Sequence, residues 1–224
     1  MDPKLALVHG SKEPVLWAET LGNFIDKQAA QYEDRPAVIF PWQSVRLSYR
    51  QLAGRSNILA KSMLEMGLCK GDCIGIMAGN CYQYIEVFLG GGRIGCPVVV
   101  LNNTYTPEEL MNAVQKSSHI KALRGDQLTN PALPELRRLV SLGHMGIGSP
   151  GVEMQSYSTF TSGVQSVFMK DSMLLRAEKS VNPEDVLNLQ FTSGITFQLF
   201  QKLSPSDPLI GTTGSPKAAM LTHK

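Results

Sequence analysis

The stretch that decides the fold reads Leu189-Gln190-Phe191-Thr192-Ser193-Gly194 and, after an interruption, Gly211-Thr212-Thr213-Gly214-Ser215-Pro216-Lys217. Joined together, the two halves form a strand that runs into a loop of glycines and hydroxyl residues, closed by one lysine. Glycines let backbone amides approach an anion closely, hydroxyl groups add hydrogen-bond donors, and a lysine supplies positive charge. The sequence therefore predicts a phosphate-binding loop, here called the phosphate loop (residues 192–194 and 211–217), which is split by residues 195–210.

The composition is that of a globular protein. The chain has 224 residues, of which 43% are hydrophobic and 18% charged, and its formal net charge is +2. The basic residues are dispersed, which argues against a nucleic-acid or anionic-membrane partner. No apolar run approaches the roughly 20 residues that cross a bilayer. The N-terminus lacks the features of a secretory signal or a matrix-targeting peptide. We expect an intracellular location, cytoplasmic or organellar, with mitochondrion and peroxisome left open.

The four cysteines do not form a recognisable metal or redox motif. Cys69, Cys73, Cys81 and Cys96 contain no C-x-x-C pair, and no histidine lies at metal-ligand spacing from them. We interpret them as free thiols, buried or half-buried, in a reducing compartment. No metal site is predicted.

Alternating helix and strand signals follow one another through the first half of the chain. An amphipathic helix is expected from Thr20, then a hairpin with strands at 37–40 and 45–49. Capping signals predict helices that begin near 48, 80 and 106, and buried strands are expected at 73–77, 96–101 and 120–123. Such alternation predicts an α/β fold with a largely parallel sheet and flanking helices.

The second half is less regular. We expect a strand at 138–142, a helix at 157–168, a polar surface connection at 170–184 and a strand at 186–191. Gly90-Gly91-Gly92 falls within or at the end of an expected helix, where glycine costs about 1 kcal/mol per residue relative to alanine. These glycines predict either an early helix break or close helix packing. Trp17 and Trp42 are interpreted as packing residues.

Several motifs occur in a fixed order along the chain. They are LSYRQL at 47–52, GDCIGIM at 71–77, RIG at 93–95, LNNTYTPEEL at 101–110 and the split phosphate loop. In this order they resemble the N-terminal part of an acyl-CoA synthetase of the AMP-binding (adenylate-forming) superfamily, most similar to a medium-chain fatty acyl-CoA synthetase. The resemblance covers about 17–194 and resumes at 211–223. It implies part of the N-terminal region of the adenylate-forming fold, with a lead-in at 1–16 and a truncated AMP-binding domain at 17–224.

The resemblance also implies a reaction in two halves. ATP and a carboxylic acid, here a fatty acid or a related acid, give an acyl-adenylate and pyrophosphate, and the thiol of CoA then takes the acyl group. The implied cofactors are ATP, Mg²⁺ and CoA. The phosphate contacts carried over by position are Thr192, Ser193, Gly194, Thr212, Thr213, Gly214, Ser215 and Lys217. Positioned donors and a cation stabilise the charge that develops on leaving pyrophosphate. A Walker-type loop is excluded because Lys217 follows proline and precedes alanine.

Two departures from the family pattern bear on activity. Residues 195–210, here called the insert, interrupt the phosphate loop, and we interpret them as translated intron sequence or a faulty gene model. The chain also ends at Lys224, before the family's later motifs and its C-terminal catalytic domain. We therefore expect no catalytic residue and no activity in this chain, a fragment of a fatty acid–CoA ligase. The alternative is a non-catalytic AMP-binding subdomain that binds a nucleotide or a partner at most, with Lys217 an ordinary surface lysine.

Two smaller points stay open. Tyr105 and Asn102-Asn103 follow an expected strand, so they can line a substrate channel or simply form the turn at the strand end. A dinucleotide-binding dehydrogenase is disfavoured because no G-x-G-x-x-G follows the first buried strand.

Overall fold

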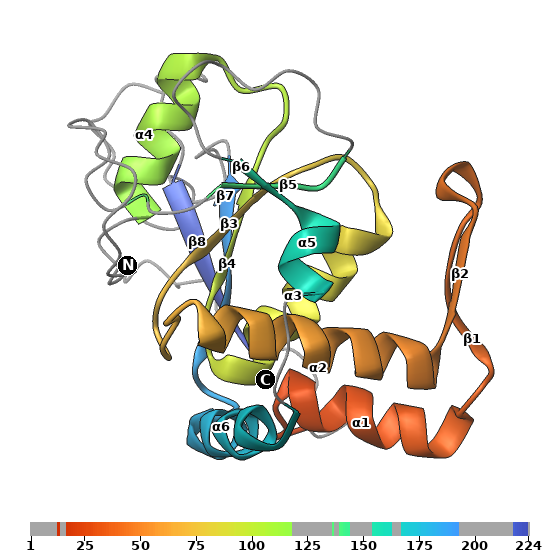
Figure 1. Ribbon diagram of the computed structural model, residues 1–224. Helices are drawn as coiled ribbons and strands as arrows, with labels where there is room; N and C mark the ends of the chain where they lie inside the picture. Colours follow the sequence, from red (N-terminus) through yellow and green to blue (C-terminus); the bar gives the residue numbers. More distant parts are fainter. Residues whose placement is uncertain are drawn as a thin grey trace, which may run out of the picture.

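A four-stranded sheet forms the centre of the fold. The computed structural model describes residues 13, 17–117, 136, 139–143, 154–162, 167–192 and 217–223. The strand order is β3-β4-β7-β8 (Figure 1), with the bounds β3 Ile74–Met77, β4 Val98–Leu101, β7 Val186–Thr192 and β8 Lys217–Thr222. Strands β3, β4 and β7 are parallel, and β8 pairs with β7 in the antiparallel sense. The predicted α/β class with a largely parallel sheet is confirmed.

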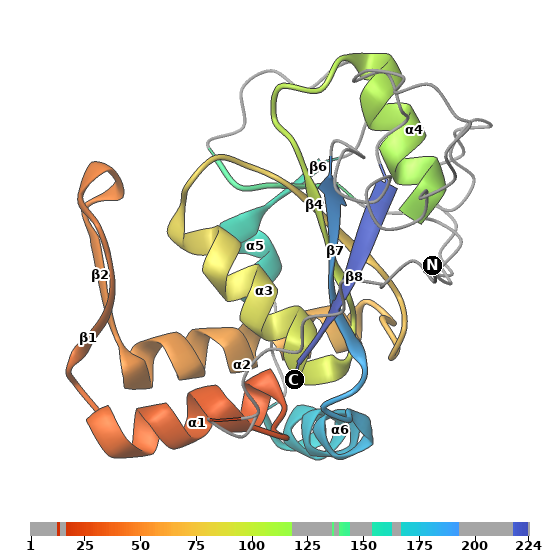
Figure 2. The same ribbon diagram turned by 180° about the vertical axis from the view of Figure 1, so that it is seen from behind.

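Helices cover both faces of this sheet, as parallel sheets require. The helices are α1 Leu21–Tyr32, α2 Tyr49–Glu65, α3 Tyr82–Ile94, α4 Pro107–Ser117, α5 Tyr157–Ser162 and α6 Val167–Ser180. Strand β4 shows the division: Val98 packs in one core with residues of α2, α3, α5 and α6, whereas Val99 and Leu101 pack in another with Ala113 of α4. Figures 1 and 2 show α4 apart from the other helices, near the end of the sheet opposite α1 and α6.

The helix starts follow the capping signals in the sequence. The hydroxyl of Thr20 accepts a hydrogen bond from the backbone N–H of Asn23. Ser48 and Gln51 form a reciprocal capping box at α2, with distances of 2.9 and 3.2 Å. Thr106 and Glu109 make the same arrangement before α4. These bonds satisfy N–H groups that have no partner within the helix.

The three glycines of α3 pack closely, and the helix continues through them to Ile94. A Cβ at Gly91 would lie 2.9 Å from the carbonyl oxygen of Cys96, and one at Gly92 would lie 2.9 Å from Leu187. Of the two alternatives that the sequence leaves, close packing is confirmed and an early break is wrong. The glycines allow α3 to approach the sheet and the chain that follows the helix.

A buried arginine joins four helices. Arg93, on α3, is fully buried, and its guanidinium donates to Asp26 of α1 at 2.8 Å, to Glu178 of α6 at 2.6 Å and to the Ser56 hydroxyl of α2 at 2.8 Å. Burial disfavours its charge, but these partners outweigh that penalty and raise the pKa of Arg93. The cluster fixes α6, which is distant in sequence, against the first three helices.

Two further strand pairs lie outside the central sheet. Strands β1 (Pro36–Phe40) and β2 (Val45–Ser48) form an antiparallel hairpin around the short 3-10 helix η1 (Pro41–Gln43). This hairpin stands beside the ends of α1 and α2 in Figures 1 and 2. Strands β5 (Leu139–Ser141) and β6 (Met154–Ser156) form a parallel pair.

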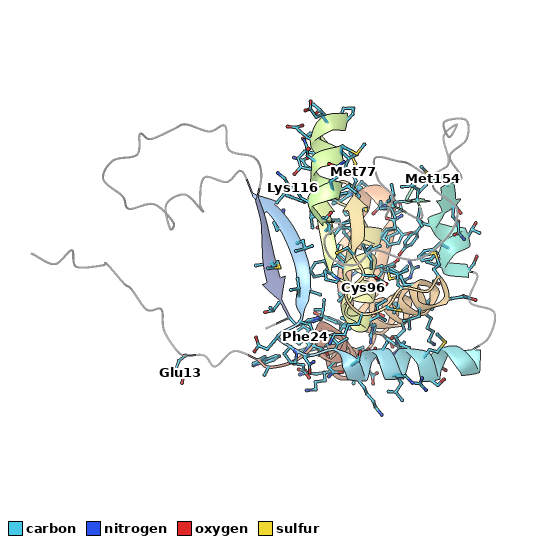
Figure 3. All side chains as sticks on the ribbon, turned by 90° about the vertical axis from the view of Figure 1, so that its left-hand side faces the viewer. Glu13, Phe24, Met77, Cys96, Lys116 and Met154 are labelled. Carbon is cyan, nitrogen blue, oxygen red and sulfur yellow. The ribbon has the colours of Figure 1, made fainter. Side chains whose placement is uncertain are left out.

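Several sequence expectations need correction. Residues 167–180 form helix α6 rather than a surface connection, and its Leu174 is buried in the main core. Strand β8 was not predicted. Strand β3 is not covered on both faces, because Met77 is 43% exposed. Figure 3 shows Met77 toward the end of the sheet where α4 lies.

The exposure of the tryptophans and cysteines tests two further interpretations of the sequence. Trp17 and Trp42 are 67% and 66% exposed, so they do not pack in the core, although each ring contacts one phenylalanine, Phe24 and Phe40 respectively. All four cysteines are free, and Cys69 alone is exposed, which contradicts its expected burial. Burial raises the pKa of the Cys73 thiol to about 11.

The strand expected at 120–123 and nearly all of the lead-in at 1–16 lie outside the described residues. No helix among the described ranges combines the length and the apolar character needed to span a bilayer.

Candidate functional site

A pocket of about 360 Å³ lies at the carboxyl ends of three parallel strands. Its lining comes from the turn after β3 and the first turn of α3, from β4 and the turn after it, and from the end of β7. The lining residues are Ala78, Gly79, Asn80, Tyr84, Val100, Leu101, Asn102, Asn103, Tyr105, Gln190 and Phe191.

The topology explains why a pocket forms at this edge. Strand β3 leads into α3, whose Val87 and Ile94 pack in the core that contains Val98. Strand β4 leads into α4, which packs on the opposite face through Ala113. Because the two connections leave the sheet on opposite sides, the carboxyl ends of β3 and β4 are left uncovered between them. In α/β sheets, ligands bind in crevices of this kind.

The pocket is neutral and rich in hydrogen-bonding groups. Its polar side chains are the carboxamides of three asparagines and one glutamine and the phenols of Tyr84 and Tyr105, and none of the lining residues carries a carboxylate or an amine. Burial raises the pKa of Tyr84, so its phenol stays protonated. Asn102 uses its carboxamide oxygen to accept hydrogen bonds from the backbone and the hydroxyl of Thr104, at 3.0 and 2.9 Å. Asn102 thus closes the turn at the strand end and also lines the pocket, while the substrate channel stays a prediction.

The ends of the split phosphate loop meet beside this pocket. Thr192 and Lys217 are register partners at the end of the β7–β8 ladder. Gln190 and Phe191, which line the pocket, directly precede Thr192. The fold therefore brings the first and last residues of the loop together, although 24 residues (193–216) separate them in sequence. The remaining predicted contacts lie outside the described residues: Ser193, Gly194, Thr212, Thr213, Gly214 and Ser215.

The described residues contain no candidate metal centre. Within 17–117 and the later described segments, no group of three or more histidine, cysteine or acidic residues is arranged to hold a metal ion.

Sequence reasoning overlooked part of the pocket. Asn80, Tyr84 and Gln190 line it, yet no motif marks them. A usable signal existed, because Asn80 follows an expected strand and Gln190 lies near the end of another. Residues at the carboxyl ends of neighbouring parallel strands converge at one edge of a sheet.

Comparison with known proteins places the chain in a family. The sequence profile described as "AMP-binding enzyme" matches residues 25–196, which is 172 of 224 residues (196 − 25 + 1). This protein belongs to the AMP-binding enzyme family. The profile match ends two residues into the insert.

Individual relatives are acyl-CoA ligases. The chain is 36% identical to the acyl-CoA ligase sidI of Beauveria bassiana, over 98% of this chain and 36% of the relative. It is 24% identical to the mitochondrial medium-chain acyl-CoA ligase ACSF2 of Macaca fascicularis, with the same coverage. The solved N-terminal subdomain of Klebsiella oxytoca NpsA, in complex with 3-hydroxybenzoyl-AMSN, shares the fold with a TM-score of 0.61 and 18% identity, over 96% of this chain and 43% of that one. The chain thus spans about a third of the length of these curated relatives.

Proposed function

We propose that this chain supplies the phosphate-binding part of an ATP-dependent acyl-CoA ligase. The observation that carries the proposal is the pairing of Thr192 with Lys217 beside the carboxyl-edge pocket. This pairing lets a Thr/Ser/Gly loop and a lysine, separated in sequence, act on one triphosphate. Backbone amides, hydroxyls and one lysine are the groups that bind a phosphate chain and stabilise pyrophosphate as it leaves.

The proposed substrate is a carboxylic acid, more narrowly a medium-chain fatty acid. The names of the relatives support the acyl-CoA ligase reaction, and the ACSF2 relative supports the medium chain length. ATP with Mg²⁺ supplies the adenylate, and CoA accepts the acyl group. The neutral pocket fits an uncharged part of a ligand whose charged phosphates lie toward the phosphate loop. A reducing intracellular location, in the cytoplasm or an organelle, accords with four free cysteines.

We further propose that the insert prevents catalysis by the chain as it stands. Adenylation needs donors held within about 0.5 Å of their productive positions. The insert separates Gly194 from Thr212, so the donors of the two loop halves are no longer positioned by their immediate neighbours. The competing proposal is a non-catalytic subdomain that binds a nucleotide without reaction.

Three variants of the chain separate these proposals. Isothermal titration calorimetry measures MgATP binding to the chain, to a variant that lacks 195–210, and to that deletion variant with Lys217→Ala. We expect the deletion to tighten MgATP binding at least tenfold and Lys217→Ala to reverse the gain. If the deletion variant binds no more tightly than the parent, the phosphate-loop assignment is wrong. ATP–pyrophosphate exchange with octanoate and decanoate then tests catalysis, and exchange by the unmodified chain would contradict the claim that the insert prevents it.

A further inference from the structure

The tip of the hairpin reaches the pocket from a distant part of the sequence. The hairpin tip is η1, Pro41–Gln43. The indole Nε1 of Trp42 donates to the carbonyl oxygen of Asn80 at 3.0 Å. The carboxamide oxygen of Gln43 accepts from the backbone N–H of Tyr82 at 2.8 Å, and its nitrogen donates to the Gln83 side chain at 2.9 Å. Asn80 lines the pocket, while Tyr82 and Gln83 begin α3.

These bonds replace a helix cap that α3 lacks. Its N-cap residue, Cys81, makes no side-chain capping bond. The first N–H groups of a helix have no partner within it and need one from elsewhere. Gln43 provides that partner from 39 residues away. The orientation of the Gln43 carboxamide is fixed because its oxygen accepts one hydrogen bond and its nitrogen donates another.

The segment held in this way is the pocket wall, residues 78–80. It connects β3 to α3, and it is fastened at the Asn80 carbonyl by Trp42 and at the first helical N–H by Gln43. Gln83 extends the connection by donating to the carbonyl of Leu142 at 3.1 Å. Asn102 and Asn103 line the same pocket, and a Cβ at Gly79 of the wall would lie 3.9 Å from the carboxamide nitrogen of Asn103.

The backbone of the hairpin tip holds the side chains of Trp42 and Gln43 in position. Ser44 adopts a left-handed conformation, φ 53°, and its N–H returns to the carbonyl of Pro41 at 3.1 Å, which closes a tight turn. Trp42 is 66% exposed, so burial of its ring does not account for its position. Among the described strands, β1 and β2 pair with each other and with no third strand, and a two-stranded hairpin is marginally stable alone. The hairpin in Figure 1 stands to the side of α3, with its tip directed away from α1 and α2.

We propose that Gln43 and Trp42 are positioning residues that fix the pocket wall for ligand binding. The geometry of the wall does not depend on the identity of the ligand. The effect on MgATP rests on the proposed function. The two parts are therefore tested with separate measurements on the same variants.

The first measurement is amide hydrogen exchange by NMR on the 224-residue chain. We compare Gln43→Ala, Gln43→Glu, Trp42→Phe and the control Arg46→Ala, which alters an exposed residue of the same hairpin. Gln43→Ala is expected to raise the exchange rate of the Tyr82 amide about tenfold, the fold change for one hydrogen bond. Gln43→Glu keeps the acceptor and restores protection. Trp42→Phe keeps an aromatic ring at this position but lacks the indole N–H that donates to Asn80. Both Gln43→Ala and Trp42→Phe are expected to shift the side-chain amide signals of Asn102 and Asn103.

Clear results would overturn the proposal. Unchanged Tyr82 exchange in Gln43→Ala would show that the cap is not formed in solution. Faster exchange without any shift at Asn102 or Asn103 would reduce Gln43 to a helix cap with no influence on the pocket. The same changes in Arg46→Ala would assign them to the hairpin in general.

The second measurement is MgATP titration in the background that lacks 195–210. Gln43→Ala is expected to weaken binding about tenfold, with Gln43→Glu recovering most of the loss. Equal affinity in Gln43→Ala would refute the part of the proposal that concerns ligand binding. If the deletion background itself binds no MgATP, the proposed function fails, and the exchange data alone then decide whether the hairpin positions the wall.

Discussion

Removal of the insert is expected to stabilise the fold by an amount that the β7–β8 register sets. The ladder ends at Thr192 and Lys217, so 24 residues (193–216) close the hairpin. Without the 16 residues 195–210 the closing segment has 8 residues (24 − 16). Loop-closure free energy scales as about (3/2)RT ln n, so a threefold shorter loop contributes about 1 kcal/mol of stability. For a domain of this size, that corresponds to a rise in Tm of roughly 2–4 °C.

Circular dichroism during thermal unfolding measures the change, and a matched variant separates length from sequence. In that control, residues 195–210 are replaced by sixteen glycine and serine residues. If the insert acts only through its length, the control melts with the parent and the deletion variant melts higher. A deletion variant that melts lower than the parent would refute the reasoning, because the insert would then contribute packing that the loop-closure argument omits.

Three further predictions concern the scaffold. Replacing Arg93 with methionine is expected to lower the urea unfolding free energy by about 3 kcal/mol, since a buried charge cluster loses its shared cation while the partly exposed Asp26 and Glu178 can rehydrate. Gly91→Ala is expected to cost about 1–3 kcal/mol in the same assay because its Cβ would lie 2.9 Å from a carbonyl oxygen, whereas Gly54→Ala, with nothing within 4 Å, gains about 0.5–1 kcal/mol. His223 accepts the Leu21 N–H through Nδ1, and burial lowers its pKa, with Lys70 acting in the same direction against Asp185. The neutral form is therefore the native one, so stability is complete above the ordinary pKa of about 6.5 and declines as the pH falls below it. His223→Asn should remove that part of the pH dependence.

The sequence predicted the central parallel strands because their signals are local. Capping residues such as Ser48 and Thr106 fix helix starts without reference to the rest of the chain. The run at 96–101 is too apolar to lie anywhere but inside the sheet. The order of the motifs then indicated the family, which the profile match over 25–196 confirms.

Helix α6 could not be predicted in the same way because its stability comes from distant partners. Its apolar and polar residues do not divide into two clear faces, so no periodic signal separates it from a polar connection. The helix is held by the burial of Leu174 and by the ion pair between Glu178 and Arg93, residues 85 positions apart. Tertiary contacts of this kind override weak local preference.

Strand β8 and the exposed tryptophans were missed for a related reason. The strand signal of Ala218, Ala219 and Met220 is short, and its pairing with β7 depends on closure of a long connection. Met220 and Leu221 are 65% and 51% exposed, which an apolar sequence does not reveal. Trp42 was interpreted as a packing residue, whereas it is largely exposed, with its ring edge-on to Phe40 and its indole N–H donating to Asn80.

The sequence indicated candidate phosphate-binding residues by their type, but it did not show which residues surround them. The phosphate loop could be proposed from the sequence because glycine, threonine and lysine supply the backbone amides, hydroxyls and positive charge that bind anions. The pocket beside it could not, because carboxamides such as Asn80 and Gln190 become neighbours only when three strands align. The hydrogen bonds from the hairpin tip to Asn80 and Tyr82 could not be predicted either, because no sequence periodicity relates residues 42–43 to residues 80–82.

The insert interrupts the chain outside the β7–β8 ladder rather than within it. The six register pairs of the β7–β8 ladder end at Thr192 and Lys217, and the insert lies beyond the last of them. Among the described residues, the core that contains Val99, Leu101 and Leu189 is formed by residues that precede the insert. A strand end that the core does not need is free to bind a ligand, and for the same reason it tolerates an insertion. Retention of the fold is consequently no evidence of adenylation, because the site depends on loop geometry that the sheet does not enforce.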